Sequence, residues 1–179
     1  MRADVPDACQ ENLEVIRATE IGRAREKVAL IAMDPIRDLA LLRIERPRSN
    51  VHVKLIESAV LVGTEAGSIG FPMSEVNERS LQFDPILRFQ GGYISSFHSL
   101  PHESGENLPY YETDTLMYSG SSGCPGFLED ASVFGMHVAS MHEWKTLIDS
   151  KMLGDRAAIS FWVPSADIAS LARSKGIRV

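Results

Sequence analysis

Short apolar runs separated by turn residues follow one another along most of the chain, which is the pattern of an all-β protein. The breaks between runs contain turn-forming residues, as at Asp34-Pro35 and Pro47-Arg48. Many short strands punctuated in this way predict a barrel or a sandwich. The expected strands cover residues 13–18, 27–33, 38–44, 69–72, 86–89, 92–97, 132–139 and 158–163.

One helix is expected, at the C-terminal end. Ser165 is a good N-cap and Gly176 a good helix stop. The apolar residues between them that share one helix face are Ile168, Leu171 and Ala172.

Three stretches interrupt the expected strands. Gly91-Gly92 separates two short strands, residues 98–109 are polar enough to predict a long loop, and residues 143–155 form a charged excursion between two strands.

Composition adds limits to this pattern. The 179 residues are 44% apolar and 23% charged, which suits one domain or two small lobes with a sizeable core. The net charge is -6, without a Lys/Arg run, so we expect no nucleic-acid partner and no polybasic membrane contact. No apolar run is long enough to span a membrane and no secretory signal is visible, so the sequence predicts a cytoplasmic protein.

Cysteine and histidine spacing gives little reason to expect a metal or another cofactor. Cys9 and Cys124 are the only cysteines, too few for a disulfide scaffold. Cys124 is interpreted as a small packed residue. Two histidine pairs, at 98/102 and 137/142, have ligand-like spacing but lie in an expected loop and strand, so we predict no metal site and no cofactor.

The segment Gly120-Ser121-Ser122-Gly123 is the main candidate for chemistry. Glycines on both sides of a serine permit positive φ and a tight turn that holds the hydroxyl clear of its own backbone. The N–H groups of Gly120 and Ser122 could then converge on the oxygen of a tetrahedral intermediate. The alternative is a plain Gly/Ser surface turn.

Further motifs occur in a fixed order along residues 28–170. They are Asp34-Pro35, Asp38-Leu39-Ala40-Leu41-Leu42, Ile69-Gly70-Phe71-Pro72, Gly92-Tyr93-Ile94-Ser95-Ser96, Thr113-Asp114, Gly120-Ser121-Ser122-Gly123-Cys124-Pro125, Val133-Phe134-Gly135-Met136-His137 and Ile159-Ser160-Phe161-Trp162-Val163-Pro164-Ser165. In this order they resemble the trypsin-like serine proteases, especially the bacterial high-temperature-requirement branch.

The resemblance implies a chymotrypsin-like double antiparallel β-barrel, here with an incomplete first barrel and a C-terminal helix. It implies that residues 1–62 are the remainder of the first lobe, 63–164 the second barrel with the nucleophile turn, and 165–179 the helix. Ser122 would be the nucleophile, and Asp38 the carboxylate that orients a catalytic histidine. The alternatives for Asp38 are a strand-end cap or an ion pair with Arg37 or Arg43.

The family needs a histidine upstream of this aspartate, but all five histidines of the chain follow Asp38. Without a general base a serine hydroxyl is a poor nucleophile at neutral pH, so we expect the chain as given to be inactive or nearly so. Two explanations stay open: a truncated form of an active serine endopeptidase, or a peptide-binding or assembly module that keeps the fold without catalysis. His98 and His102 could reach the cleft from their expected loop and stand in for the missing base, but we expect both to be solvated loop residues.

By the same register, Leu116 occupies the position of the family's pocket floor, which argues against a basic P1 residue. His137 lies in a segment that resembles a strand of glutamyl endopeptidases, where a histidine contacts a P1 Glu or Gln; the alternative is a histidine packed on a half-buried strand. The implied partner is a peptide or protein substrate. Unpaired strand edges of an incomplete first barrel could also pair with a second copy of the chain.

Overall fold

The computed structural model describes residues 14–19, 22–44, 52–72, 75–77, 82–84, 86–146 and 152–179. The chain divides into two compact units, Met1–His52 with Ser170–Val179, and Val53–Ala169. The predicted lobe boundary at residues 62/63 stays a prediction.

The first unit contains a three-stranded antiparallel sheet in the order β1-β2-β3. Its strands are β1 (Glu14–Thr19), β2 (Gly22–Asp34) and β3 (Leu39–Ile44). Among the described side chains of the sheet, Val28 and Ala32 of β2 and Leu39 of β3 are buried and apolar, while Met33, Leu42 and Ile44 stay partly exposed. The described part of the sheet thus combines a few buried apolar side chains with an apolar side that is partly exposed.

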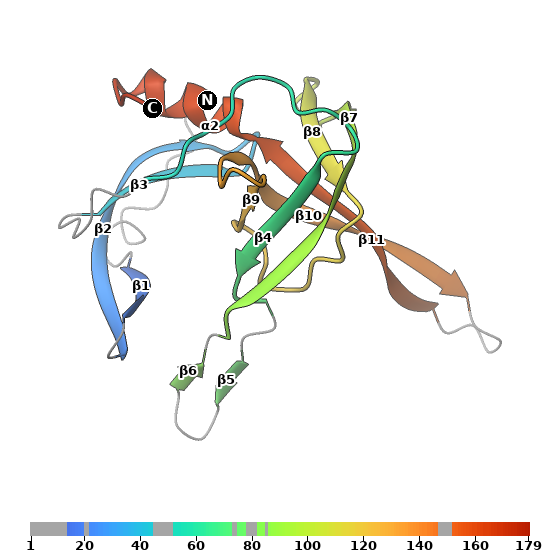
Figure 1. Ribbon diagram of the computed structural model, residues 1–179, viewed down its shortest axis with the longest axis horizontal. Coiled ribbons are helices and arrows are strands. Elements are labelled where there is room, and N and C mark those ends of the chain that lie inside the picture. Colours follow the sequence, from blue (N-terminus) through green and yellow to red (C-terminus); the bar gives the residue numbers. More distant parts are fainter. Residues whose placement is uncertain are drawn as a thin grey trace. The chain divides into compact units, whose positions relative to one another are not determined.

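The second unit is a closed antiparallel barrel in which the order of strands is β10-β11-β8-β7-β4-β9 (Figure 1). A separate hairpin pairs β5 (Glu75–Asn77) with β6 (Gln82–Asp84). The barrel strands are β4 (Glu65–Gly70), β7 (Arg88–Pro101), β8 (Asn107–Thr113), β9 (Pro125–Phe127), β10 (Val133–Thr146) and β11 (Met152–Pro164).

Aromatic rings from three strands fill the barrel. The Phe134 ring lies 5.6 Å from that of Tyr111 and 5.4 Å from that of Trp162, centroid to centroid. Trp162 is buried, and its indole N–H donates to the Thr113 hydroxyl at 2.9 Å, so no polar group of this ring is left unsatisfied. A Cβ at Gly126 would lie 2.5 Å from the Phe134 ring, so the core needs glycine at that place in β9.

The helix α2 (Ser165–Ser174) ends the fold as predicted. Ser165 is fully buried and its hydroxyl donates to the Ile56 carbonyl. At the other end Gly176 has φ 72°, and its N–H bonds to the carbonyl of Arg173, as expected for a glycine that stops a helix. No helix of the described residues has the length and apolarity that a membrane crossing needs.

The all-β architecture is confirmed, but two expected interruptions are not there. β7 is continuous through Gly91-Gly92, and the predicted loop 98–109 shrinks to the few residues between Pro101 and Asn107. Gly92 is required by close approach and does not break the strand, because a Cβ there would lie 2.4 Å from the Asp114 carboxylate. Part of the charged excursion 143–155 belongs to β10 and β11, which continue as a two-stranded ribbon beyond the other barrel strands (Figure 1).

Candidate active site

Two consecutive tight turns hold the predicted nucleophile. The Ser121 N–H donates to the Tyr118 carbonyl at 3.0 Å, and the Cys124 N–H donates to the Ser121 carbonyl at 3.0 Å. The third residue of each turn is a glycine with positive φ, 90° at Gly120 and 85° at Gly123. This is the type II pattern, which requires glycine at that position. The Gly-x-Ser-Gly sequence therefore has a geometric reason.

The turns are fastened to the barrel by β10. The Gly123 N–H donates to the His137 carbonyl at 2.8 Å, and the His137 N–H donates to the Cys124 carbonyl at 2.9 Å. Ser121 is fully buried, whereas Ser122 is exposed. The two turns thus bury the Ser121 side chain and expose the Ser122 side chain to solvent.

The Gly120 and Ser122 N–H groups make no hydrogen bond within the described part of the chain. The turn hydrogen bonds use the neighbouring N–H groups of Ser121, Gly123 and Cys124 instead. Two unused donors on either side of an exposed hydroxyl are the elements that an oxyanion hole requires.

Cys124 is a packed residue, as expected. It is buried, and a Cβ at Gly70 would lie only 2.0 Å from its Sγ atom. Burial raises the pKa of the Cys124 thiol, opposed in part by a hydrogen bond from the Phe71 backbone. The thiol is therefore protonated at neutral pH and is not a second nucleophile. Cys9 lies outside the described residues.

His137 is buried, and its ring packs edge-on against Trp162 at 5.2 Å between centroids. Its Nε2 atom lies 3.1 Å from the Ser140 hydroxyl, which lies 3.3 Å from the Ser160 hydroxyl. The Ser160 hydroxyl donates to the Thr115 carbonyl at 2.7 Å.

The two ring nitrogens of His137 differ in their surroundings. Nε2 contacts the Ser140 hydroxyl, whereas the buried Nδ1 has no hydrogen-bond partner in the described part of the chain. Burial lowers the pKa of His137, although the nearby Ser121 and Ala139 backbones raise it in part.

Ser140, Ser160 and Thr115 were not among the predicted site residues. The Ser140 and Ser160 hydroxyls meet because β10 and β11 pair in register, with Ser140 opposite Ser160. The Thr115 carbonyl then accepts from Ser160. A polar residue at a strand position that faces the barrel interior is the only local signal, and it is weak. Leu116, the predicted pocket floor, is half-buried, and its carbonyl accepts a hydrogen bond from the Gln90 amide.

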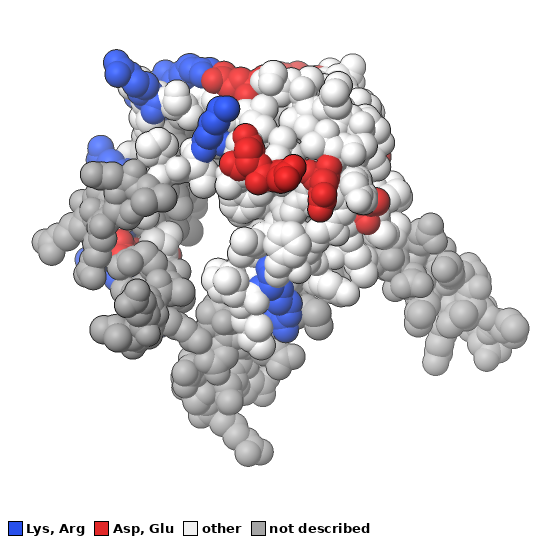
Figure 2. Space-filling view, viewed as in Figure 1, with Lys and Arg blue, Asp and Glu red and all other residues white. Residues whose placement is uncertain are grey.

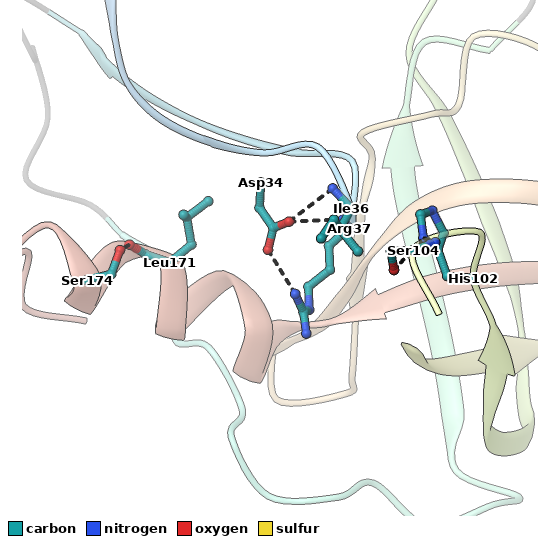
Figure 3. Close-up of polar contacts among 7 residues, drawn as sticks. All are labelled: Asp34, Ile36, Arg37, His102, Ser104, Leu171 and Ser174. Carbon is teal, nitrogen blue, oxygen red and sulfur yellow. Dashed lines mark hydrogen bonds and ion pairs between the residues drawn. The ribbon is translucent and has the colours of Figure 1, made fainter. Parts of the chain in front are cut away.

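Asp38 lies in the first unit, at the end of the turn that connects β2 to β3. Asp34 holds this turn, since its carboxylate accepts from the N–H groups of Ile36 at 3.1 Å and Arg37 at 3.2 Å (Figure 3). The Arg37 guanidinium also pairs with Asp34, at 3.1 Å. Asp38 has φ 53°, a left-handed conformation that is rare outside glycine.

The Asp38 carboxylate is exposed and makes no hydrogen bond or ion pair within the described residues. Neither alternative of the sequence analysis, a strand-end cap or an ion pair with Arg37 or Arg43, is therefore observed in that part of the chain. Ser122 belongs to the second unit, Val53–Ala169, whereas Asp38 belongs to the first.

The other described histidine side chains have partners of their own. His98 lies on β7, not in a loop, and contacts the Ser96 hydroxyl at 3.0 Å and the Glu112 carboxylate at 3.4 Å. His102 contacts the Ser104 hydroxyl at 3.0 Å (Figure 3). None of these interactions involves Ser122. Among the residues that the structure describes, no three His, Cys, Asp or Glu side chains gather as a metal site would require.

A closed antiparallel barrel with an exposed serine on a glycine turn just before a short strand is a feature of the chymotrypsin-like serine peptidases. The sequence matches the trypsin-like peptidase domain over residues 4–136, and the chain belongs to that family.

Solved structures show the same fold. The MamO protease domain from Magnetospirillum magneticum is 18% identical, with a TM-score of 0.61 over 88% of this chain and 73% of that one. Deg5 is 21% identical, with a TM-score of 0.60 over 88% of this chain and 65% of that one. The active form of the Rv3671c protease from M. tuberculosis is 16% identical, with a TM-score of 0.64 over 87% of this chain and 61% of that one.

The chain thus spans about two thirds of the length of these structures. At such identities they establish the fold alone. Among curated proteins, no sequence matches the chain.

Proposed function

We propose that this domain is of the serine endopeptidase type, with Ser122 as the nucleophile of peptide-bond hydrolysis. The observation that carries the proposal is the pair of turns around Ser122, which exposes its hydroxyl and leaves the Gly120 and Ser122 N–H groups free. The Ser122 oxygen would attack the carbonyl carbon of the peptide bond. The two N–H groups would then donate to the oxyanion of the tetrahedral intermediate.

The Ser122 proton must go to a base and then to the leaving amine. By resemblance to the family, that base is a histidine oriented by Asp38. The hydrogen bonds of His98, His102 and His137 support the proposal that none of them serves, since each ring is engaged elsewhere. We infer that the 179 residues alone hydrolyse peptides very slowly or not at all.

A fluorophosphonate probe tests this proposal, because it reacts only with activated serine hydroxyls. We expect slow labelling of Ser122 in the chain as given, and faster labelling when imidazole is added as an external base. Ser122→Ala should abolish labelling, and Ser119→Ala is the matched control that should leave it unchanged. Equal labelling of Ser122 with and without imidazole would contradict the need for an added base, and no labelling under either condition would contradict a nucleophilic Ser122.

The second candidate is a peptide-binding or assembly module without catalysis. It is favoured by the absence of any histidine contact to Ser122 within the described residues. Retained binding of a substrate peptide, together with no labelling of Ser122 even in imidazole, would identify this function. Its assembly mode would use the outer strands β1 and β3 of the three-stranded sheet to pair with a second copy.

We also propose that His137 and Leu116 contribute to the pocket for the P1 side chain. The His137 ring could exchange its hydrogen bond to the Ser140 hydroxyl for one to a Glu or Gln side chain, while Leu116 provides an apolar surface. Peptide inhibitors that differ only at P1 test this proposal. Glu or Gln should bind more tightly than Arg, and His137→Phe should remove the difference. Preferred binding of the Arg peptide would contradict it.

A further inference from the structure

The outer face of the barrel at β9, β4 and β7 carries exposed aromatic side chains. Gly67 of β4 pairs with Phe127 of β9 on one side and with Gly91 of β7 on the other. Paired residues, and every second residue along a strand, lie on the same face of a sheet. Phe127, Gly67, Gly91 and Phe89 therefore share this face, and inward-facing Ala66 lies on the opposite one.

Phe89 is held in place although it is 71% exposed. A Cβ at Gly67 would lie 2.7 Å from Cε2 and Cζ of the Phe89 ring, and a Cβ at Gly91 would lie 3.2 Å from Cε1. The outer end of the ring thus covers both glycines. The result is an aromatic surface that is supported from below and open to solvent.

A hollow of about 320 Å³ lies against this ring, and a second of about 530 Å³ shares part of its lining with the first. Glu65 and Glu129 line both hollows, Phe89 and Phe127 line the first, and Asp130 lines the second. Figure 2 shows acidic side chains gathered across this part of the barrel, where β4 begins and the β9–β10 turn lies. We call this surface, made of these five residues, the acidic groove.

Two of the three carboxylates of the groove are available for a cation. Glu65 and Glu129 make no ion pair within the described residues. Asp130 accepts hydrogen bonds from the Ser132 hydroxyl and from its N–H at 3.0 Å, and these bonds lower the pKa of Asp130, aided by the charge of Lys54. Asp130 therefore stays ionised at any ordinary pH.

We propose that the acidic groove binds an extended segment of a partner protein in which an arginine or lysine stands beside an apolar residue. The cationic group would lie over the open face of Phe89, because the face of an aromatic ring attracts cations. Glu65 and Glu129 line the same hollow as the ring and would pair with the cationic group. A guanidinium can donate two parallel hydrogen bonds to a carboxylate. The apolar neighbour would cover Phe127. The negative charge of the groove would repel a nucleic acid.

This inference uses none of the residues of the serine turn. It goes beyond the proposed peptidase function and does not depend on it.

Binding of two labelled hexapeptides to the full chain tests the proposal, by fluorescence anisotropy. The first probe is Gly-Val-Arg-Val-Arg-Gly, and the second has Glu in place of both Arg residues. We expect only the Arg peptide to bind, and to bind more weakly as salt is raised. Phe89→Ala and Glu129→Gln should each weaken binding about three- to fivefold, the size expected for an exposed cation–π contact.

Matched controls are Leu61→Ala, an exposed apolar residue outside the groove, and Glu103→Gln, an exposed carboxylate in the β7–β8 turn. Both should bind as the unchanged chain does. Ser122→Ala should also bind normally, and Phe89→Ala should leave fluorophosphonate labelling unchanged, so failure of one proposal is distinguishable from failure of the other.

Three outcomes would overturn the inference. They are equal binding of the Glu peptide, no binding of the Arg peptide, and full binding by a folded Phe89→Ala variant. Self-association that Phe89→Ala abolishes, seen by sedimentation without any peptide binding, would assign the face to a second copy of the chain instead.

Discussion

At the scale of single residues, His137 should make stability depend on pH. Burial lowers its pKa, so at mildly acidic pH the unfolded chain binds a proton that the folded chain does not. The free energy of unfolding should therefore fall as pH decreases below about 6.5, the ordinary pKa of histidine. His137→Gln keeps a donor for Ser140 but does not titrate, so this variant should show a flatter profile of melting temperature between about pH 7 and 5. His52→Gln, at an exposed position, is the control. Parallel profiles for His137→Gln and the unchanged chain would contradict the assignment.

At the scale of elements, the end of β4 packs directly on the serine turn. A methyl group at Gly70 would overlap Cys124 Sγ at 2.0 Å but would lie 3.3 Å from its Cβ. We expect Gly70→Ala to destabilise the fold by about 1–3 kcal/mol, as overpacking does. Adding Cys124→Ala removes the overlapping atom, so the double variant should lose less stability than the sum of the two single variants. Chemical denaturation of the four proteins measures this coupling. If the stability losses of the two single variants simply add up in the double variant, residues 70 and 124 are not in steric contact.

At the scale of the whole molecule, the two units differ in how much they bury. Ile94, Leu108, Phe134 and Trp162 of the barrel are each at most 1% exposed, whereas Val28, Ala32 and Leu39 of the three-stranded sheet retain 5–8%. Backbone amides should therefore exchange with solvent faster in β2 and β3 than in β8 and β11. Hydrogen exchange followed by mass spectrometry of peptides from each unit checks this expectation. One common rate for both units would indicate that they unfold together.

Local chemistry accounts for what the sequence predicted well. The glycines at 120 and 123 predict a turn because glycine adopts positive φ readily, and Gly176 stops the helix for an equally local reason. The all-β class follows from the succession of short apolar runs and turn residues. Asp38 was predicted as a site residue only through the resemblance, since a carboxylate before a strand has many local explanations, and its role stays a prediction.

What the sequence did not show depends on residues far apart in the chain. Gly92 looks like a break in the pattern, but its reason lies in Asp114, which approaches it across β7 and β8. The hydrogen-bonded Ser140 and Ser160 meet through the register of β10 and β11. Neither the strand register nor the close approach of Asp114 to Gly92 can be recognised from a short stretch of sequence.

The tandem turn at the serine has a stereochemical consequence. At Gly123 a side-chain carbon would meet no atom within 4 Å, so only the handedness of the backbone stands against a larger residue there. An L-amino acid is penalised at φ 85°, whereas its mirror image favours that conformation. A semisynthetic chain with D-alanine at position 123 should therefore fold at least as stably as the natural one, while L-alanine should weaken it.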